Sequence, residues 1–428
     1  MNKLMEFCLN ITDGEHGSVT DVTDSKYYFL NNNNITDSGI SINNNDRRIS
    51  KEEFERIHKR TQLETGDVVI ASCGTIGKAQ VIRDTSINYD FSRSVGIIKC
   101  NKDILLPEFL YFYLKNPETQ KRIARASEGA VQKHFYIGAM EDFEVEIPDI
   151  KTQQEIIVCL SAIEAKISNN NAICSDLESM AKLLYDYWFV QFDFPDENGR
   201  PYKSSGGKMV WNEELKREIP EGWKVAPFEK CIASINTGLN PRDNFQLNTG
   251  GKIRYLTVKN LTKEGTIDFT SCDMIDEDAR AIVHRRSDIQ VGDILFASIS
   301  PLGRCHVITE TPEDWDINES VFSIRPNYQN MTSIFLYMTF MSDVFIKKAE
   351  GSSAGSVFKG IRISELQGLN TILPPKAILN AFDEQTKNIF KMKAIAFAEN
   401  QQLAALRDFL LPMLMNGQVK VADKTSEE

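Results

Sequence analysis

The segment that comes nearest to a catalytic motif lies at residues 72–79 and reads SCGTIGKA. A phosphate-binding P-loop requires G-x-x-x-x-G-K-[ST], in which the last hydroxyl binds magnesium. Here Ser72 replaces the first glycine, and Ala79 replaces the hydroxyl residue. A similar segment, residues 298–305, reads SISPLGRC and lacks the lysine as well. Both segments therefore predict a tight turn between two strands, and they argue against a nucleotide site.

The other residue types that commonly carry chemistry are scattered along the chain. It has five histidines and eight cysteines. No histidines have the H-x-x-x-H spacing of zinc proteases, and no cysteines form the C-x-x-C of zinc ribbons and redox sites. No G-x-S-x-G elbow is present. The sequence therefore predicts no catalytic residue and no metal ligand, and it favours a binding protein over an enzyme.

Candidate binding residues lie in loops that match between two parts of the chain. Residues 128–143 read EGAVQKHFYIGAMEDF, and residues 350–366 read EGSSAGSVFKGIRISEL. Cations on Gly- and Ser-rich loops suit contacts with phosphates, and Arg and Lys also read base edges. The alternative is that these loops are simply solvated, because most surface charges have no specific partner. The residues predicted to bind DNA are Lys78, Lys133, His134, Tyr136, Arg304, Lys359 and Arg362.

Net charge and asparagine content add little to this prediction. The net charge is −11, but nucleic-acid binding needs only a local basic face. Asparagines in residues 31–34 and 42–46 could reach adenine edges. Plain polar loops are the favoured reading of both stretches, because asparagine is common in turns.

The chain contains one module written twice, at an offset of 226 residues. Phe29-Leu30 aligns with Tyr255-Leu256, and Gly66-Asp67 aligns with Gly292-Asp293. The same offset returns over residues 72–82, 94–95, 109–111 and 148. A period of this length indicates duplicated domains and excludes a solenoid of short repeats.

Each copy begins with strand patterns and ends with a helix pattern. Residues 66–72 (GDVVIAS) and 292–298 (GDILFAS) predict buried strands, each followed by a turn and a returning strand. Residues 106–116 and 331–342 predict amphipathic helices. Residues 145–150 and 371–376 predict a last strand that ends at proline.

After each proline the apolar period becomes that of a coiled coil. The first seam is predicted at positions 156, 160, 163, 167, 170, 174, 177, 181, 184 and 188. The second is predicted at positions 378, 382, 385, 389, 392, 396, 399, 403, 406 and 410. Helices of about 50 Å cannot leave such stripes exposed, so we expect them to pair antiparallel, with Asn170 and Gln385 fixing the register. The alternative is that each helix packs only on its own domain.

These patterns predict an α+β protein in which two tandem mixed α/β domains are each followed by a long helix. No run of 18 apolar residues and no signal peptide is found, so a cytoplasmic protein with free thiols and no membrane contact is expected. The predicted divisions are a first domain (1–150), a central helical region (151–191), a connector (192–218), a second domain (219–375), a C-terminal helical region (376–416) and a flexible tail (417–428).

Several of these segments resemble the specificity (S) subunit of type I restriction-modification systems, and the resemblance covers nearly the whole chain. IPEGWKVAPFEKCIASINTG (219–238) is similar to the opening of that family's recognition domain. GDVVIASCGTIGKAQVI (66–82) is similar to its core strand-turn-strand, and LLYDYWFVQFDFP (183–195) to the end of its central helix. IPDIKTQQEI (147–156) and LPPKAILNAF (373–382) are similar to its passage from last strand to helix. The first copy departs from the family by lacking the usual Pro-x-Gly-Trp lead-in.

The resemblance implies a specificity subunit without catalytic activity or a cofactor of its own. Each domain would be a target recognition domain that reads one half of a bipartite target in double-stranded DNA. The helix pair would set the gap and dock two methyltransferase subunits, which use S-adenosylmethionine. A restriction subunit, where present, would add cleavage that requires ATP and magnesium. The alternative function is a tandem-domain protein-interaction scaffold, which would show no salt-dependent affinity for DNA.

Overall fold

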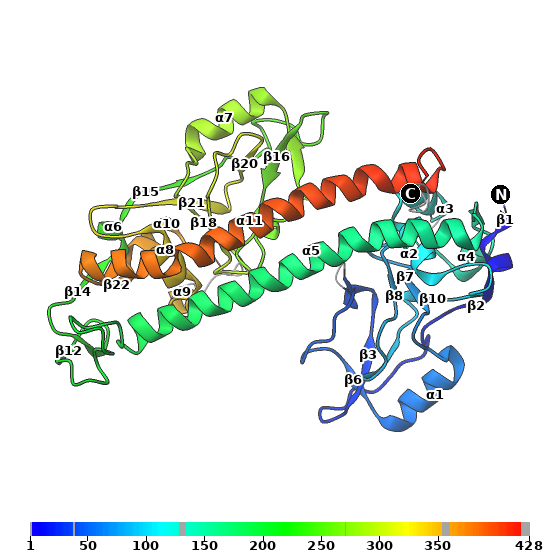
Figure 1. Cartoon of the computed structure of the whole chain (residues 1–428), viewed down its shortest axis with the longest axis horizontal. Coiled ribbons are helices and arrows are strands. Elements are labelled where there is room, and N and C mark those ends of the chain that lie inside the picture. Colours follow the sequence, from blue (N-terminus) through cyan, green and yellow to red (C-terminus); the bar gives the residue numbers. More distant parts are fainter. Residues whose placement is uncertain (1, 37–38, 128–133, 270, 353–359, 421–428) are drawn as a thin grey trace, which may run out of the picture. The chain divides into compact units, whose positions relative to one another are not determined.

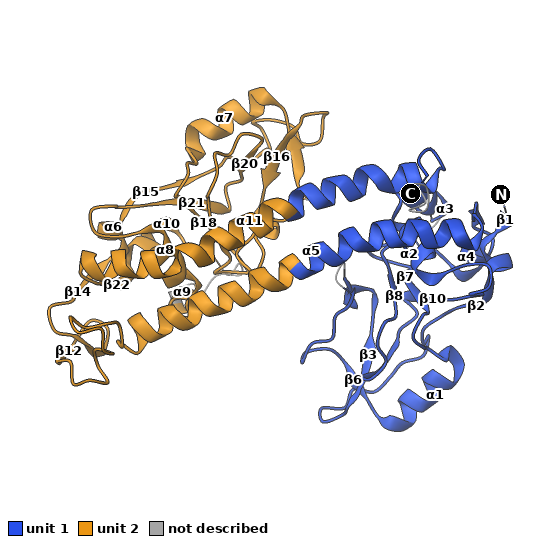
Figure 2. Ribbon diagram, in the orientation of Figure 1, with its two compact units in different colours: residues 1–169, 400–428 blue, residues 170–399 orange. Residues whose placement is uncertain are grey.

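The structure is a computed structural model that describes residues 2–36, 39–127, 134–269, 271–352 and 360–420 (Figure 1). The chain divides into two compact units (Figure 2). Unit 1 comprises residues 1–169 and 400–428, and unit 2 comprises residues 170–399. Two long helices, α5 (Ile150–Tyr185) and α11 (Lys376–Met415), contribute to both units.

The centre of unit 1 is an antiparallel four-stranded sheet in the order β2-β10-β7-β8. Every residue of β7 is buried, as the sequence predicts for a central strand. A second sheet has the order β6-β3-β9, in which β3 and β9 are parallel. The strands of these two sheets are β2 (Cys8–Asp13), β3 (Tyr27–Leu30), β6 (Arg48–Ile49), β7 (Val68–Ala71), β8 (Ala79–Val81), β9 (Asn88–Phe91) and β10 (Val95–Cys100).

Short helices cover the sheets of unit 1. Helix α1 (Lys51–Thr61) begins at Ser50, whose hydroxyl accepts a hydrogen bond from the Glu53 amide, as helix N-caps commonly do. It lies on β3 and β9 (Figure 1). The other short elements are β1 (Asn2–Lys3), η1 (Leu4–Phe7), η2 (Asn32–Asn34), β4 (Ile35–Thr36), β5 (Gly39–Ile40), α2 (Pro107–Lys115), α3 (Pro117–Ala126), α4 (Ile137–Glu141) and β11 (Glu144–Val145).

Unit 2 repeats this arrangement. Its four-stranded sheet has the order β15-β21-β18-β19, and its three-stranded sheet the order β17-β16-β20. The elements are β14 (Lys224–Pro227), α6 (Phe228–Cys231), β15 (Ile232–Thr237), β16 (Ile253–Leu256), η4 (Val258–Asn260), β17 (Asp273–Ile275), α7 (Glu277–Ser287), β18 (Ile294–Ala297), β19 (Cys305–Val307), β20 (Trp315–Ile317), β21 (Val321–Pro326), α8 (Ser333–Met341), α9 (Asp343–Ser352), α10 (Ile363–Gly368) and β22 (Asn370–Leu373). The duplication that the sequence shows is therefore a duplication of the fold.

Buried polar contacts are repeated with the fold. In unit 1 the buried Asp90 accepts hydrogen bonds from Thr61 at 2.6 Å and lies 3.3 Å from His58. In unit 2 the buried Asp316 contacts Ser287 at 2.6 Å and His284 at 3.0 Å. Each carboxylate ties the last turn of α1 or α7 to the neighbouring strand, and these partners offset part of the cost of burying it.

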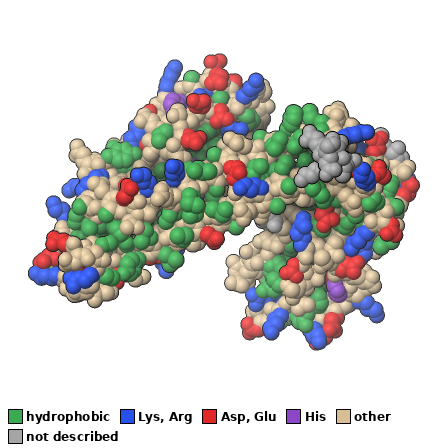
Figure 3. Space-filling view, viewed as in Figure 1, with side chains coloured by type: hydrophobic (Ala, Val, Ile, Leu, Met, Phe, Trp, Pro, Cys, Tyr) green, Lys and Arg blue, Asp and Glu red, His purple; other side chains and the backbone are tan. Residues whose placement is uncertain are grey.

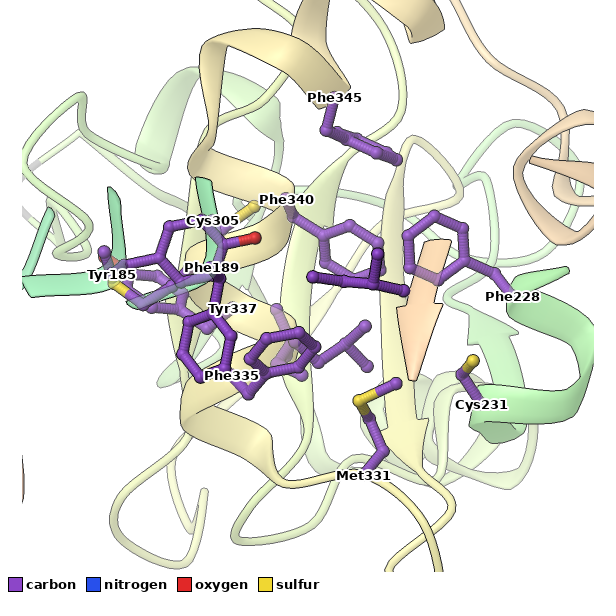
Figure 4. Packing of buried hydrophobic residues seen from close by; sticks show 14 of the residues in the cluster. Tyr185, Phe189, Phe228, Cys231, Cys305, Met331, Phe335, Tyr337, Phe340 and Phe345 are labelled. Carbon is purple, nitrogen blue, oxygen red and sulfur yellow. The ribbon is translucent and has the colours of Figure 1, made fainter. Parts of the chain in front are cut away.

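The largest hydrophobic cluster lies in unit 2 and is rich in aromatic rings (Figure 4). Phe340, Phe345 and Phe228 form one group, with ring centroids 4.9 to 5.6 Å apart. Phe189 contacts Phe335 edge-on at 4.7 Å. Phe189 belongs to η3 (Asp186–Val190), a π-helical turn that ends α5. The aromatic run near residue 188 therefore anchors the end of α5 in unit 2.

The long helices pair antiparallel within each unit. In unit 1 the Asn400 amide donates to the Ile167 carbonyl at 3.5 Å, and Arg407 lies 4.0 Å from Glu164. In unit 2 the Asn170 amide donates to Glu399 at 2.7 Å. None of the ten predicted positions of the first seam is exposed, and eight of them are buried. The first seam and the antiparallel pairing are confirmed.

Four of the ten positions of the second seam were predicted correctly, at Phe382, Ile389, Ala396 and Leu403, and the other six were predicted one residue too early. Gln385 is exposed, so it cannot fix the register; Met392 and Leu406 are exposed too. The side chains that turn inward, buried or half-buried, are Leu379, Phe382, Thr386, Ile389, Lys393, Ala396, Asn400, Leu403, Arg407, Leu411 and Leu414. In the true seam every seventh residue is polar: Thr386, Lys393, Asn400 and Arg407. A heptad pattern based on apolar residues does not include such positions.

The segment between α5 and the second copy contains a hairpin. Strands β12 (Met209–Asn212) and β13 (Arg217–Pro220) pair antiparallel. Strand β14 then pairs with β22, so the beginning and end of the second copy meet. The division into units cuts across both long helices, and the domain boundaries given above remain predictions.

Candidate nucleic-acid interface

The predicted loops meet at one place in each unit. In unit 1 the Phe135 amide donates to the Ser72 carbonyl at 2.8 Å, which joins the 134–136 segment to the turn after β7. In unit 2 the Ile361 amide donates to the Ser298 carbonyl at the same distance. The two bonds are related by the offset of the repeat. Each copy therefore presents a turn and a loop side by side, and we call this surface the turn-loop surface.

The turn-loop surface of unit 1 contains Lys78, His134 and Tyr136. Lys78 is half-buried and ends the turn, where Gly74 and Gly77 adopt positive φ angles of 67° and 87°. His134 stacks on Tyr136 with ring centroids 5.2 Å apart, and the tyrosine side chain is 60% exposed. An exposed aromatic pair beside cations suits contact with bases or sugars. The predicted Lys133 lies outside the described residues.

The turn-loop surface of unit 2 contains Arg304 and Arg362. Arg304 donates to the Leu261 carbonyl at 2.9 Å, which holds the guanidinium against the loop that follows η4. Arg362 is exposed at the start of α10, and its backbone amide donates to Glu365 at 2.8 Å. The predicted Lys359 lies outside the described residues. The two surfaces share a position for one cation, at Lys78 and Arg304, and differ in the other side chains.

The structure adds two residues to the surface of unit 1. A side chain on Gly74 would meet the Asn32 amide nitrogen at 2.8 Å, so Asn32 lies directly beside the turn. Arg93 is exposed in the loop between β9 and β10. Burial raises the pKa of the Cys73 thiol, and the charge of Arg93 opposes this rise, so Arg93 lies near the turn. In the second copy Val258 and Glu319 stand at these two positions. A pattern shared by both copies could not have found residues that differ between them.

Other asparagines of the polar stretches hold the loops together. The buried Asn34 accepts a hydrogen bond from the Asn31 amide at 2.9 Å and donates to the Ser41 carbonyl at 2.9 Å. Asn260 makes the equivalent bonds in unit 2, to Thr257 and Asp268. Asn34 and Asn260 are therefore loop formers, as favoured above for these stretches.

The described residues contain no group of three or more His, Cys, Asp or Glu side chains placed to hold a metal ion. Within the described ranges, no helix is long and apolar enough to cross a membrane.

The turn at residues 72–79 joins β7 to β8, as predicted, and Ala79 is buried in β8. The side chains of the turn-loop surfaces are thus hydrogen-bond donors and aromatic rings, which suit an anionic, base-bearing partner.

A second surface consists of exposed apolar side chains on the long helices. In unit 2, Met180, Leu183 and Tyr187 of α5 and η3 are exposed, and so are Met392 and Ile395 of α11. Figure 3 shows hydrophobic side chains among the charged ones over the helices of unit 2. In unit 1 the exposed members are Val158, Leu406 and Phe409. Both long helices therefore carry exposed apolar side chains in addition to their buried seam.

Comparison with known proteins identifies the family. Residues 17–179 match the sequence model of the family described as type I restriction modification DNA specificity domain. The type I restriction enzyme MjaIX specificity subunit of Methanocaldococcus jannaschii is 24% identical over 385 residues, which are 90% of this chain and 84% of the relative. Residues 17–179 therefore carry the DNA specificity domain of that family, and over most of its length the chain is similar to type I restriction enzyme specificity subunits. The HindI specificity subunit of Haemophilus influenzae is 23% identical to this chain over 410 residues, 83% of this chain and 87% of the relative.

A solved structure has a similar fold. The S subunit of a type I restriction-modification system from M. genitalium matches with a TM-score of 0.51 and 15% identity, and the match covers 96% of this chain and 95% of that one. The fold class predicted from the sequence, two tandem α/β domains each followed by a long helix, is therefore confirmed. The relatives named above are specificity subunits, and this chain is similar to them over most of its length.

Proposed function

We propose that the two turn-loop surfaces each read one half of a bipartite target in double-stranded DNA. The observation that carries the proposal is that the same turn and loop occur twice, on the same frame, with different side chains. Phosphates are alike in every sequence, whereas base edges differ. Shared cations such as Lys78 and Arg304 suit phosphate contacts, and side chains that differ between the copies suit contacts with two different half-sites.

The long helices would serve the assembly of the complex. Each is continuous from one unit into the other, and α11 has 40 residues, or about 60 Å at 1.5 Å per residue. Their length would fix the gap between the half-sites. Their exposed apolar faces would dock two methyltransferase subunits, which bring S-adenosylmethionine, and the complex would act in the cytoplasm. A restriction subunit would join with ATP and magnesium where cleavage occurs.

The DNA proposal is tested by sequencing methylated adenines in a host that expresses this chain with its methyltransferase subunit. We expect one motif with two short defined blocks and an undefined gap. Binding is then measured by fluorescence anisotropy with the intact target and with either block scrambled. Scrambling one block should weaken binding at least tenfold, and affinity should fall steeply with salt. A salt-independent or undetectable affinity would favour the protein-scaffold alternative and contradict the proposal.

The docking proposal is tested by placing charge on the exposed apolar faces. Leu183→Glu and Phe409→Glu should abolish co-purification with the methyltransferase subunit, because a carboxylate on a buried interface costs several kcal/mol. Gln402→Glu, also exposed on α11, is the matched control and should leave co-purification unchanged. Unchanged assembly of both apolar-face variants on size-exclusion chromatography would rule this surface out.

A further inference from the structure

A cavity of about 570 Å³ lies in unit 1 beside the turn after β7. Its walls are the turn residues 74–79 and one face of the helices that follow, with Lys115, Gln120, Ala124 and Ser127. Sites for small molecules usually measure about 300–1,000 Å³, so this space is large enough for a ligand of that size. The cavity adjoins the turn-loop surface, since both include Lys78.

The polar groups of the cavity offer a donor and an acceptor together. Lys115 donates to the Tyr111 hydroxyl at 2.9 Å and to Glu164 at 2.8 Å, which leaves one of the three N–H groups of an ammonium. The Gln120 amide nitrogen donates to the carbonyls of Gly77 at 2.9 Å and Leu114 at 2.5 Å. Both amide donors of Gln120 are therefore used, and the group left for a ligand is the acceptor Oε1.

This pairing distinguishes between ligand classes. A phosphate carries only acceptors, and a carbonyl oxygen such as Gln120 Oε1 would repel it. A nucleobase edge carries a donor next to an acceptor, which matches Gln120 and Lys115. The apolar side chains of Ile76, Ala79 and Ala124 complete the lining and suit the faces of a flat ring. Lys78, Lys115 and the Thr75 hydroxyl also suit a phosphate, but only a nucleobase edge uses the acceptor Gln120 Oε1 as well. The lining therefore suits a nucleobase better than a bare phosphate.

The second copy provides an internal comparison. Ile346 stands where Gln120 stands in the first copy, and Met341 stands in place of Lys115. A side chain on Gly303 would meet Ile346 at 2.9 Å, just as one on Gly77 would meet Gln120 at 2.5 Å, so the two residues occupy the same place. Met341 and Leu302, the counterpart of Ile76, pack against the hydrophobic core of unit 2. The fold thus accepts an apolar lining, and the polar lining is a property of the first copy.

We propose that the cavity lined by Lys115 and Gln120 binds a nucleobase. The proposal rests on the function given above, because the source of the base would be the half-site that the first copy reads. One base of that half-site would leave the stack and enter the cavity. Unstacking the base costs a few kcal/mol, so only a base whose contacts in the cavity offset this cost would be selected. A free nucleotide has the same chemistry and is the other possible source.

The experiment uses the full chain and its target duplex, with 2-aminopurine placed in turn at each position of both half-sites. Wild type should enhance 2-aminopurine fluorescence at one position of one half-site. Gln120→Ile, which introduces the residue of the second copy, should abolish the enhancement and weaken binding roughly 5- to 150-fold, the range of one lost base contact. Lys121→Ile, at an exposed position next to Gln120, is the matched control and should keep the enhancement.

A second arm titrates the chain alone with nucleoside monophosphates by calorimetry. Binding that Gln120→Ile abolishes and Lys121→Ile retains would support the same cavity with a free nucleotide as its ligand. If wild type binds its target but no position brightens, and no monophosphate binds, the proposal is overturned while the DNA-reading function stands. Enhancement that survives Gln120→Ile would likewise overturn it. Failure of the wild-type chain to bind any duplex would instead contradict the proposed function. The calorimetric titration with nucleoside monophosphates would then decide whether the cavity binds a nucleobase.

Discussion

The ion pair between Lys393 and Glu178 gives a direct test of the antiparallel pairing in unit 2. The side chain of Lys393 is 8% exposed and that of Glu178 is 15% exposed, and the two are hydrogen-bonded. The Tyr337 hydroxyl donates to the same carboxylate at 2.8 Å; burial raises the pKa of this tyrosine well above its ordinary value, so the proton stays on the hydroxyl. Replacing the carboxylate with an amide would leave a buried ammonium with neutral partners only.

The magnitude follows from the exposure of the two groups. Removing one member of a fully buried ion pair costs about 3–5 kcal/mol, and the slight exposure here places Glu178→Gln near the lower end, at about 3 kcal/mol. Replacing both members with methionine removes the charges together and should cost about 1 kcal/mol, mostly from the unpaired Tyr337 hydroxyl. The double variant should thus be more stable than the single one.

The assay is guanidinium unfolding followed by tryptophan fluorescence. The chain has four tryptophans, at positions 188, 211, 223 and 315, and all of them lie in unit 2, so the signal reports this unit. Glu384→Met with Lys387→Met is the control, because that pair on α11 is exposed and should change stability by less than about 0.5 kcal/mol. If Glu178→Gln is as stable as wild type, or the double variant is less stable than Glu178→Gln, the reasoning is refuted.

Three further measurements test other parts of the structure. Burial lowers the pKa of His306 to about 4, so between pH 6.5 and 4 the unfolded state binds a proton that the folded state does not. The free energy of unfolding of unit 2 should therefore fall by about 3 kcal/mol as the pH falls through that range. His306→Asn should remove this pH dependence in unfolding experiments, and an unchanged profile would refute the assignment. Leu379→Ala should cost about 2–5 kcal/mol and Gln385→Ala less than about 0.5 kcal/mol in urea unfolding, because only the first side chain is buried in the corrected seam; the reverse order would restore the seam predicted from the sequence. Lys78→Ala should lower the slope of log affinity against log salt by about 1 in DNA titrations, whereas Lys121→Ala, whose lysine pairs with Glu118, should not; equal slopes would remove Lys78 from the interface.

The features that the sequence predicts best are those marked by a repeating pattern of apolar residues. The offset of 226 residues, the strands after Gly66 and Gly292 and the first seam all depend on burial of apolar side chains, which periodicity records. The second seam was predicted only in part, because the polar residues Lys393, Asn400 and Arg407 lie in it. The same offset, applied to the first seam, gives the correct positions, since residues 153 to 188 map onto 379 to 414.

Contacts between distant residues could not be predicted in this way. His58 and Asp90 form a pair only because α1 lies on β9, and nothing in the spacing of the two residues indicates it. The cavity beside Gly77 depends on side chains from two later helices, among them Lys115 and Gln120. Of the predicted DNA-binding residues, the structure places Lys78 with His134 and Tyr136, and Arg304 with Arg362. Their contact with DNA remains a prediction.

The noncontiguous composition of unit 1 has a consequence for biosynthesis. Leu411 and Leu414, from the end of the chain, belong to the same hydrophobic cluster as Leu4 and Leu160. The nascent chain must therefore keep the inward face of residues 150–169 uncovered until residues 400–415 leave the ribosome. At about 5–20 residues per second this interval lasts roughly 10 to 50 s. During translation, the first unit would depend on chaperones, or on an early-binding partner subunit, to shield that face.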